Sequence, residues 1–237
     1  MERIVTESEI FPLIEGRSVL LNGPRGAIIE PLDFSIEPGT LTIFLGHAGS
    51  GRTSLLLALT GRLKLSKQSQ LYVLGYELPD DMRAVRNESE IIGVNDLDRL
   101  DEQVTVGATV RERLSLYARA WTHIPRVTDA KVNEILAPIF GTRPIPQARD
   151  LVYELSELDN LLFRIALAMI SQPKLLAVDN IDSLHEDQDR AVLLEILNKV
   201  ASTGVTVVAS ATGEEALRVV VEMPHNIVIL NNSSEER

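Results

Sequence analysis

Residues 46–53 combine three glycines, one cation and two hydroxyls at a spacing suited to holding a phosphate group. They fit the phosphate-loop pattern GxxxxGK[ST] except at Arg52, where the pattern has lysine. The glycines let backbone N–H groups point at phosphate oxygens, assisted by the dipole of the following helix, and the hydroxyl of Thr53 is suited to binding Mg²⁺. We therefore predict a nucleotide-phosphate site. Its residues are Gly46, His47, Ala48, Gly49, Ser50, Gly51, Arg52, Thr53 and Ser54.

Arg52 keeps the positive charge of the expected lysine but not its shape. A guanidinium is a planar fork, bulkier than an ammonium and different in hydrogen-bond geometry. We therefore expect the segment to hold a phosphate group while positioning a transferable γ-phosphate poorly. An alternative is a strand-to-helix turn that binds no ligand.

The elements predicted around this segment alternate between strands and helices. An apolar strand precedes the loop and an apolar helix follows it, which is the context that a phosphate loop requires. Strands are predicted at 18–22, 27–36, 41–45, 70–75, 91–94, 175–178, 205–209 and 227–230. Helices are predicted at 54–63, 109–121, 128–140, 155–170, 187–200 and 214–221, with Thr109 as the N-cap of the second and Trp121 in its packed core. The alternation implies a parallel sheet covered on both faces.

Composition limits the class of protein. The chain of 237 residues is 45% apolar, has no cysteine and carries a net charge of −11. This charge argues against a nucleic-acid binder. No apolar run approaches the ~18–20 residues needed to span a bilayer, and no secretory signal is visible. We expect a soluble, intracellular protein.

The order of these elements resembles the nucleotide-binding domain of ABC ATPases over about residues 17–230. Four further segments fall where that family has its motifs. They are 155–159 (LSELD) for the LSGGQ signature, 173–179 (PKLLAVD) for the Walker B strand, 183–186 (SLHE) for the D-loop, and 206–216 for the strand and turn of the switch histidine.

The resemblance implies an α/β fold with a P-loop NTPase, RecA-like core, in which a mostly parallel sheet has helices on both faces. An antiparallel β subdomain and an inserted helical subdomain, at about residues 97–158, complete it. Residues 17–230 then form a single domain, residues 1–16 an N-terminal extension and residues 231–237 a polar tail.

The resemblance also assigns roles at the expected reaction centre. Asp179 corresponds to the Mg²⁺ carboxylate, and with Thr53 and Asp96 it is a candidate metal ligand. Asn180 replaces the glutamate that activates water. An amide cannot accept a proton at neutral pH, so general-base assistance of typically ~10²–10⁴-fold is missing. Ala211 stands at or beside the switch histidine, and Asn95 or Asp96 replaces the loop glutamine.

The signature and the adenine contact are altered as well. In the family the serine and glycines of this motif contact the γ-phosphate bound by the opposite subunit; here Ser156 is retained, but Glu157 and Asp159 place carboxylates where that anion would approach. Ser156-x-x-Asp159 also reads as a helix capping box, which we expect to be its main role. The aromatic residue expected near residues 22–25 is missing.

Two functions remain open from these residues. The first is a degenerate ABC transporter ATP-binding subunit that binds ATP and Mg²⁺, hydrolyses ATP slowly or not at all, and docks on an integral membrane permease through residues 96–126. It would act as a homodimer or heterodimer, on the cytoplasmic face of the membrane, and residues 109–112 are most similar to cassettes of ABC-2-type exporters. The alternative is a non-catalytic scaffold or regulator, in which Arg52 only neutralises local carboxylates.

Overall fold

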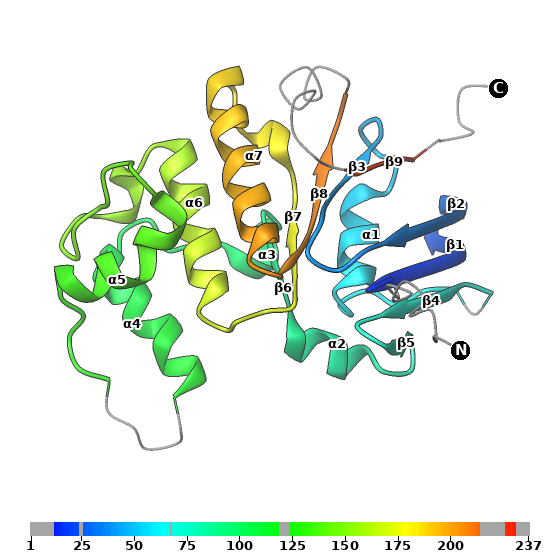
Figure 1. The fold of residues 1–237 in the computed structure, drawn as a ribbon, viewed down its shortest axis with the longest axis horizontal. Coiled ribbons are helices and arrows are strands. Elements are labelled where there is room, and N and C mark those ends of the chain that lie inside the picture. The colour runs from blue at the N-terminus through cyan, green and yellow to red at the C-terminus, as the bar shows by residue number, and fades with distance from the viewer. Residues whose placement is uncertain (1–11, 24–25, 67, 119–123, 214–225, 231–237) are drawn as a thin grey trace, which may run out of the picture.

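Two β-sheets and a group of helices form three adjacent parts of the molecule (Figure 1). The computed structural model describes residues 12–23, 26–66, 68–118, 124–213 and 226–230. A parallel sheet occupies the middle, an antiparallel sheet flanks it on one side, and helices flank it on the other. The predicted helix 214–221, Trp121 and the tail 231–237 lie outside the described residues.

The central sheet has five strands in the order β6-β7-β8-β3-β9, and all of its neighbouring pairs are parallel. Its strands are β3 (Leu41–Leu45), β6 (Ser89–Ile92), β7 (Leu175–Val178), β8 (Thr206–Ala211) and β9 (Asn226–Ile229). Every residue of β3, β7 and β8 is buried. Continuous apolar runs therefore predicted these three strands well, because a parallel sheet is covered on both faces.

The second sheet is antiparallel, with four strands in the order β2-β1-β4-β5. Its strands are β1 (Ile14–Gly23), β2 (Gly26–Ile36), β4 (Gln70–Val73) and β5 (Tyr76–Leu78). β1 begins at Ile14 and pairs there with Val73, so the last residues of the expected N-terminal extension 1–16 belong to an inner strand of this sheet.

The helices divide between the two faces of the parallel sheet. They are α1 (Arg52–Leu59), α2 (Met82–Glu88), α3 (Asn95–Asp98), α4 (Val106–Tyr117), α5 (Asp129–Phe140), α6 (Glu157–Met169) and α7 (Asp187–Ser202). Alternate residues of β3 enter two cores: Ile43 packs in the core shared with α4–α7, and Phe44 in the core shared with α1 and the antiparallel sheet. Within the described part of the chain, no helix is long and apolar enough to cross a bilayer.

Helix starts show where local sequence signals hold and where they fail. Ser156 caps α6, as predicted, and Thr128, where a helix was predicted to begin, caps α5; each accepts a hydrogen bond from a backbone N–H three residues later. The predicted cap at Thr109 is wrong. α4 begins one turn earlier because Thr105 is its N-cap, and the Thr109 hydroxyl donates to the Thr105 carbonyl instead.

Candidate functional site

The loop between β3 and α1 has the backbone form of a phosphate loop. Gly51 has a φ of 87°, and a Cβ built on it would lie 2.6 Å from Cγ1 of Ile29 and 2.8 Å from Cγ2 of Ile28. Glycine is therefore required at this position by both conformation and space. Gly49 has a φ of 84°, but a Cβ there would meet no atom within 4 Å. One glycine faces packed side chains and the other faces open space.

The start of α1 fits a bound phosphate group. Gly51 is the N-cap of α1 and, as a glycine, has no side chain that could cap this helix end. The backbone N–H groups of the first turn therefore receive no cap from the N-cap residue and lie next to the open space at Gly49. Ser50 is only 2% exposed, and its Oγ has no hydrogen-bond partner among the described residues. The loop offers uncapped donors and room, which are what a phosphate needs.

The predicted metal ligands Thr53 and Asp179 meet beside this loop, although they are far apart in sequence. The Thr53 hydroxyl donates to Oδ2 of Asp179 at 2.6 Å, and the Ser210 hydroxyl donates to Oδ1 of the same carboxylate at 2.5 Å. Hydroxyl and carboxylate oxygens suit Mg²⁺, which usually keeps several waters and binds substrate phosphates besides one or two carboxylates. Within the described ranges there is no cluster of three or more His, Cys, Asp or Glu side chains that would hold a metal alone.

Ser210 lies in the segment 206–216 that the resemblance assigned to the switch histidine, but its contact with Asp179 was not predicted. The third predicted metal ligand, Asp96, has its backbone in α3, but its side chain lies outside what the structure describes. The same holds for Asn95.

The positions expected to activate water carry no base. Asn180 follows Asp179, two residues after the end of β7. It is half-buried, and its Oδ1 has no hydrogen-bond partner in the described part of the molecule. Ala211 ends β8, is fully buried and packs in the core shared with α4–α7. An amide and a methyl group supply no proton acceptor at neutral pH. These two positions therefore carry no general base.

Arg52 contacts other protein residues around the loop. Its Nη1 donates to Oγ1 of Thr212 at 3.0 Å and lies 3.9 Å from Oδ2 of Asp182. Asp182 lies in the turn after β7, and its carboxylate also accepts a short hydrogen bond from the Thr212 backbone N–H. The Arg52 side chain is 11% exposed and that of Asp182 is 25% exposed. Sequence patterns did not single out Asp182 or predict its contact with the loop.

The signature-like segment is built as a helix start. The Ser156 hydroxyl accepts the Asp159 N–H at 3.1 Å and donates to Oδ2 of the same residue at 2.8 Å. Arg143 donates to Oδ1 of Asp159 from Nε at 3.1 Å and from Nη2 at 2.8 Å. The carboxylate of Glu157 lies 3.0 Å from Nδ1 of His185, and both side chains are exposed. Asp159 is therefore compensated by an arginine that the sequence reasoning overlooked.

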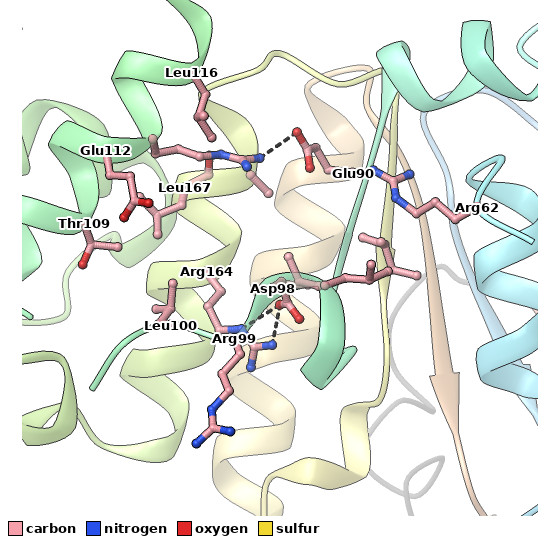
Figure 2. Close-up of a pocket in the computed structure, with 15 residues that line it drawn as sticks. Arg62, Glu90, Asp98, Arg99, Leu100, Thr109, Glu112, Leu116, Arg164 and Leu167 are labelled. Carbon is pink, nitrogen blue, oxygen red and sulfur yellow. Dashed lines mark hydrogen bonds and ion pairs between the residues drawn. The ribbon is translucent and has the colours of Figure 1, made fainter. Parts of the chain in front are cut away.

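A second hollow lies among β6, α3, α4 and α6, in the region predicted to dock a partner (Figure 2). This groove has a volume of about 370 Å³. Two ion pairs join its walls, Arg113 with Glu90 at 2.7 Å and Arg164 with Asp98. Burial is the main cause that lowers the pKa of Arg62, which also lines it.

The groove also presents apolar surface. The side chains of Leu97 and Leu116 are 53% and 68% exposed, which is unusual for leucine. Arg99 and Glu112 are the exposed charged residues of its lining.

Comparison with known families and proteins agrees with this geometry. Residues 29–183 match a family described as "ABC transporter". The chain is 24% identical over 197 residues to ABC transporter G family member 30 of Arabidopsis thaliana, covering 79% of this chain but 13% of that protein. It is 25% identical over 182 residues to the Nod factor export ATP-binding protein I of Rhizobium etli, covering 77% of this chain and 54% of that protein. The chain thus spans only part of these relatives.

Solved structures show the same fold. The ADP conformation of MJ1267, an ATP-binding cassette of an ABC transporter, superposes with a TM-score of 0.72 at 15% identity, over 93% of this chain and 87% of that one. The cbiO1 protein of Clostridium perfringens, part of the transporter complex cbiONQ, gives 0.73 at 14% identity, over 93% and 85% of the two chains. The predicted fold class, a phosphate-loop core with a parallel sheet and an antiparallel β part, is confirmed.

Proposed function

Because this chain belongs to the ABC transporter family, we propose that it is an ATP-binding subunit that couples nucleotide binding to a membrane permease while hydrolysing ATP slowly or not at all. The nucleotide would bind through residues 46–54, with Mg²⁺ held at Thr53 and Asp179. One observation carries the proposal: the Thr53 hydroxyl at the start of α1 donates to the Asp179 carboxylate, whereas the adjoining residue, Asn180, has no basic group.

The chain's own residues would divide the work of binding. The loop glycines and the uncapped start of α1 would orient the phosphates, and the Asp179 carboxylate would hold Mg²⁺ in place of its present hydrogen bond from Thr53. Bound Mg²⁺ would neutralise phosphate charge. The amide of Asn180 would orient a water molecule without removing its proton.

Steady-state ATPase assays on the purified protein with Mg²⁺ test the hydrolytic half of this proposal. We expect turnover far below the ~1 s⁻¹ at the slow end of ordinary enzymes. The Asp179→Ala variant is the matched control, because it removes the metal carboxylate and reports any contaminating activity. Turnover of ~1 s⁻¹ or more that disappears in Asp179→Ala would contradict a degenerate site.

The partner proposed for this subunit is an integral membrane permease, bound through residues 96–126 at the cytoplasmic face. The groove between α3 and α4 supports this, because its exposed leucines and its rim of charged residues suit an amphipathic segment of a partner. A relative is named as an export protein, which favours an exporter of the ABC-2 type. The subunit would pair with itself or with a second nucleotide-binding domain.

Co-purification with a co-expressed candidate permease tests the docking proposal. Leu116→Glu places a charge on an exposed leucine of the groove, so complex formation should be lost while the fold is kept. Tyr153→Glu, another change at a well-exposed residue but outside the groove, is the control. Equal loss in both variants, or in neither, would contradict docking at the groove.

A non-catalytic scaffold is the second candidate, and the contacts of Arg52 favour it. This cation already contacts Thr212 and Asp182, as expected if it only neutralises carboxylates of its own chain. Calorimetric titration with ATP and ADP in the presence of Mg²⁺ separates the candidates. Absence of binding at millimolar nucleotide favours the scaffold, whereas binding that is lost in Arg52→Ala favours the transporter subunit.

A further inference from the structure

We infer that Asp182 competes with a bound phosphate for Arg52, and that Arg52, Asp182 and Thr212 latch the phosphate loop to the segment after β8 until an anion binds. The competition rests on the proposed function, since it presupposes that residues 46–54 bind a nucleotide phosphate. The contacts that make up the latch are those of Arg52 with Thr212 and Asp182, and of Asp182 with Thr212.

Three separate segments meet in this latch. Arg52 is the first residue of α1, Asp182 lies in the turn after β7, and Thr212 directly follows β8. Arg52 donates to Oγ1 of Thr212 at 3.0 Å and lies 3.9 Å from Oδ2 of Asp182. The Asp182 carboxylate accepts the Thr212 N–H, which closes the triangle. Each residue therefore contacts the other two.

Burial makes the contacts of this latch energetically relevant. The side chains of Arg52 and Asp182 are 11% and 25% exposed, so neither charge is fully hydrated. Interaction between opposite charges strengthens as the local dielectric falls below that of water. If either partner is removed, the other charge is left partly buried without compensation, which is the costly arrangement.

A phosphate in the loop would change the partners of Arg52. The guanidinium belongs to the residue that directly follows Gly51 at the uncapped start of α1, so a phosphate bound there would lie beside it. Two anions beside one cation repel each other, and the doubly charged phosphate is the stronger partner. Exchange of Asp182 for phosphate would weaken the link to Thr212. Phosphate binding would thereby change the contacts of Thr212, the first residue after β8.

The latch is tested first in the protein without nucleotide, by thermal unfolding of Arg52→Ala, Asp182→Asn and the double variant. Each single variant should lower the melting temperature by about 2–4 °C, and the double variant by clearly less than the two shifts together, because the partners share one interaction. Additive shifts would overturn the latch. If Arg52→Ala does not fold, Arg52→Gln replaces it in both tests.

The competition is tested by calorimetric titration of the same variants with Mg²⁺-ATP. Asp182→Asn removes the competing charge and should bind about three- to tenfold more tightly than the wild type, roughly 0.7–1.4 kcal/mol. This gain should vanish in the Arg52→Ala background. Glu195→Gln, which neutralises an exposed carboxylate on α7, is the matched control and should bind as the wild type does.

Each result of the titration has a defined meaning. Unchanged or weaker binding in Asp182→Asn, or an equal gain in Glu195→Gln, overturns the competition. Binding by Asp182→Asn alone, with none by the wild type, supports it strongly. If no variant binds at millimolar nucleotide, the proposed function and the competition both fail, while the unfolding experiment still decides whether the latch exists.

Discussion

Two arginine–aspartate pairs can be compared, one at the signature-like segment and one at the phosphate loop. They differ in how closely the arginine approaches the carboxylate and in whether the arginine has another partner. Arg143 holds Asp159 by two hydrogen bonds, at 3.1 and 2.8 Å, next to the cap of α6. Arg52 approaches Asp182 only to 3.9 Å while donating to Thr212. The Arg143–Asp159 pair is therefore in direct hydrogen-bond contact, whereas the Arg52–Asp182 pair is not.

We interpret the Arg143–Asp159 pair as structural, and the Arg52–Asp182 pair as one whose arginine also belongs to the proposed phosphate site. Asp159 interacts with both Ser156 and Arg143, so the signature-like segment is now a well-capped helix start. Arg52 lies on the phosphate loop, where a tight internal pair would exclude an anion. A loose internal pair keeps the loop folded and leaves its charge available, which fits a site that binds phosphate without hydrolysing it.

The largest effect is expected from Gly51→Ala, which would disrupt the phosphate loop that carries Arg52. The new Cβ would lie 2.6 Å from a carbon of Ile29 in a left-handed backbone conformation. We expect a loss of about 3 kcal/mol of stability, from strain and overpacking, and loss of nucleotide binding. Gly49→Ala, with a similar φ but open space around it, should cost only about 1 kcal/mol. Equal losses in chemical denaturation would contradict the packing role of Gly51.

A moderate effect is expected from Arg143→Ala, which removes the tight pair. Asp159 would keep its contacts with Ser156 but lose its cation, so we expect a loss of about 1–2 kcal/mol. Nucleotide affinity should stay unchanged, in contrast to Arg52→Ala. Asp159→Asn in the Arg143→Ala background should recover part of the stability. A fall in nucleotide affinity in Arg143→Ala would show that the signature-like segment and the phosphate loop are not independent.

The smallest effect is expected at the pair Glu88–Lys174, whose lysine is exposed and which serves as a baseline for the two site pairs. The hydrogen bond from Lys174 is the main cause that lowers the pKa of Glu88, with a further contribution from Tyr76. A lowered carboxyl pKa stabilises the fold above the ordinary pKa of 4.5, and this stabilisation is lost as the pH falls through the lowered value.

Melting temperatures of the wild type and Glu88→Gln should therefore differ slightly at neutral pH and converge in acid. The difference should be smaller than that for Arg143→Ala, because Lys174 is 66% exposed. A difference that grows as the pH falls would contradict this sign.

Signals within a few residues were enough to predict most elements. Thr128 and Ser156 can cap helices because an N-cap side chain bonds to a backbone N–H only three residues later. The phosphate loop could be recognised because its glycines have the characteristic spacing. Thr109 failed although it fits a capping box, because distant residues set the start of α4. The N–H groups of Val106 and Gly107 bond to the carbonyls of Asp150 and Ala148. Tertiary hydrogen bonds outweighed the local pattern.

The contacts that define the site were not predictable in the same way. Ser210 with Asp179, Arg52 with Asp182 and Arg143 with Asp159 join residues on different elements. A single sequence indicates that a carboxylate is present but not which cation reaches it. For this reason Asp159 was expected to repel an anion, whereas the structure shows a compensated charge.

The end of β6 has one further property. The Asp179 N–H donates to the carbonyl of Ile92 at 2.9 Å, and a Cβ on Gly93 would overlap the carbonyl oxygen of Asp179. The Gly93 N–H in turn donates to Asp98, which lines the groove, at 2.8 Å. The Asp98 side chain and the main chain of Gly93 and Ile92 therefore connect α3 to Asp179. Neither Asn180 nor Ala211 takes part in this connection, so it does not depend on which side chains stand at those two positions.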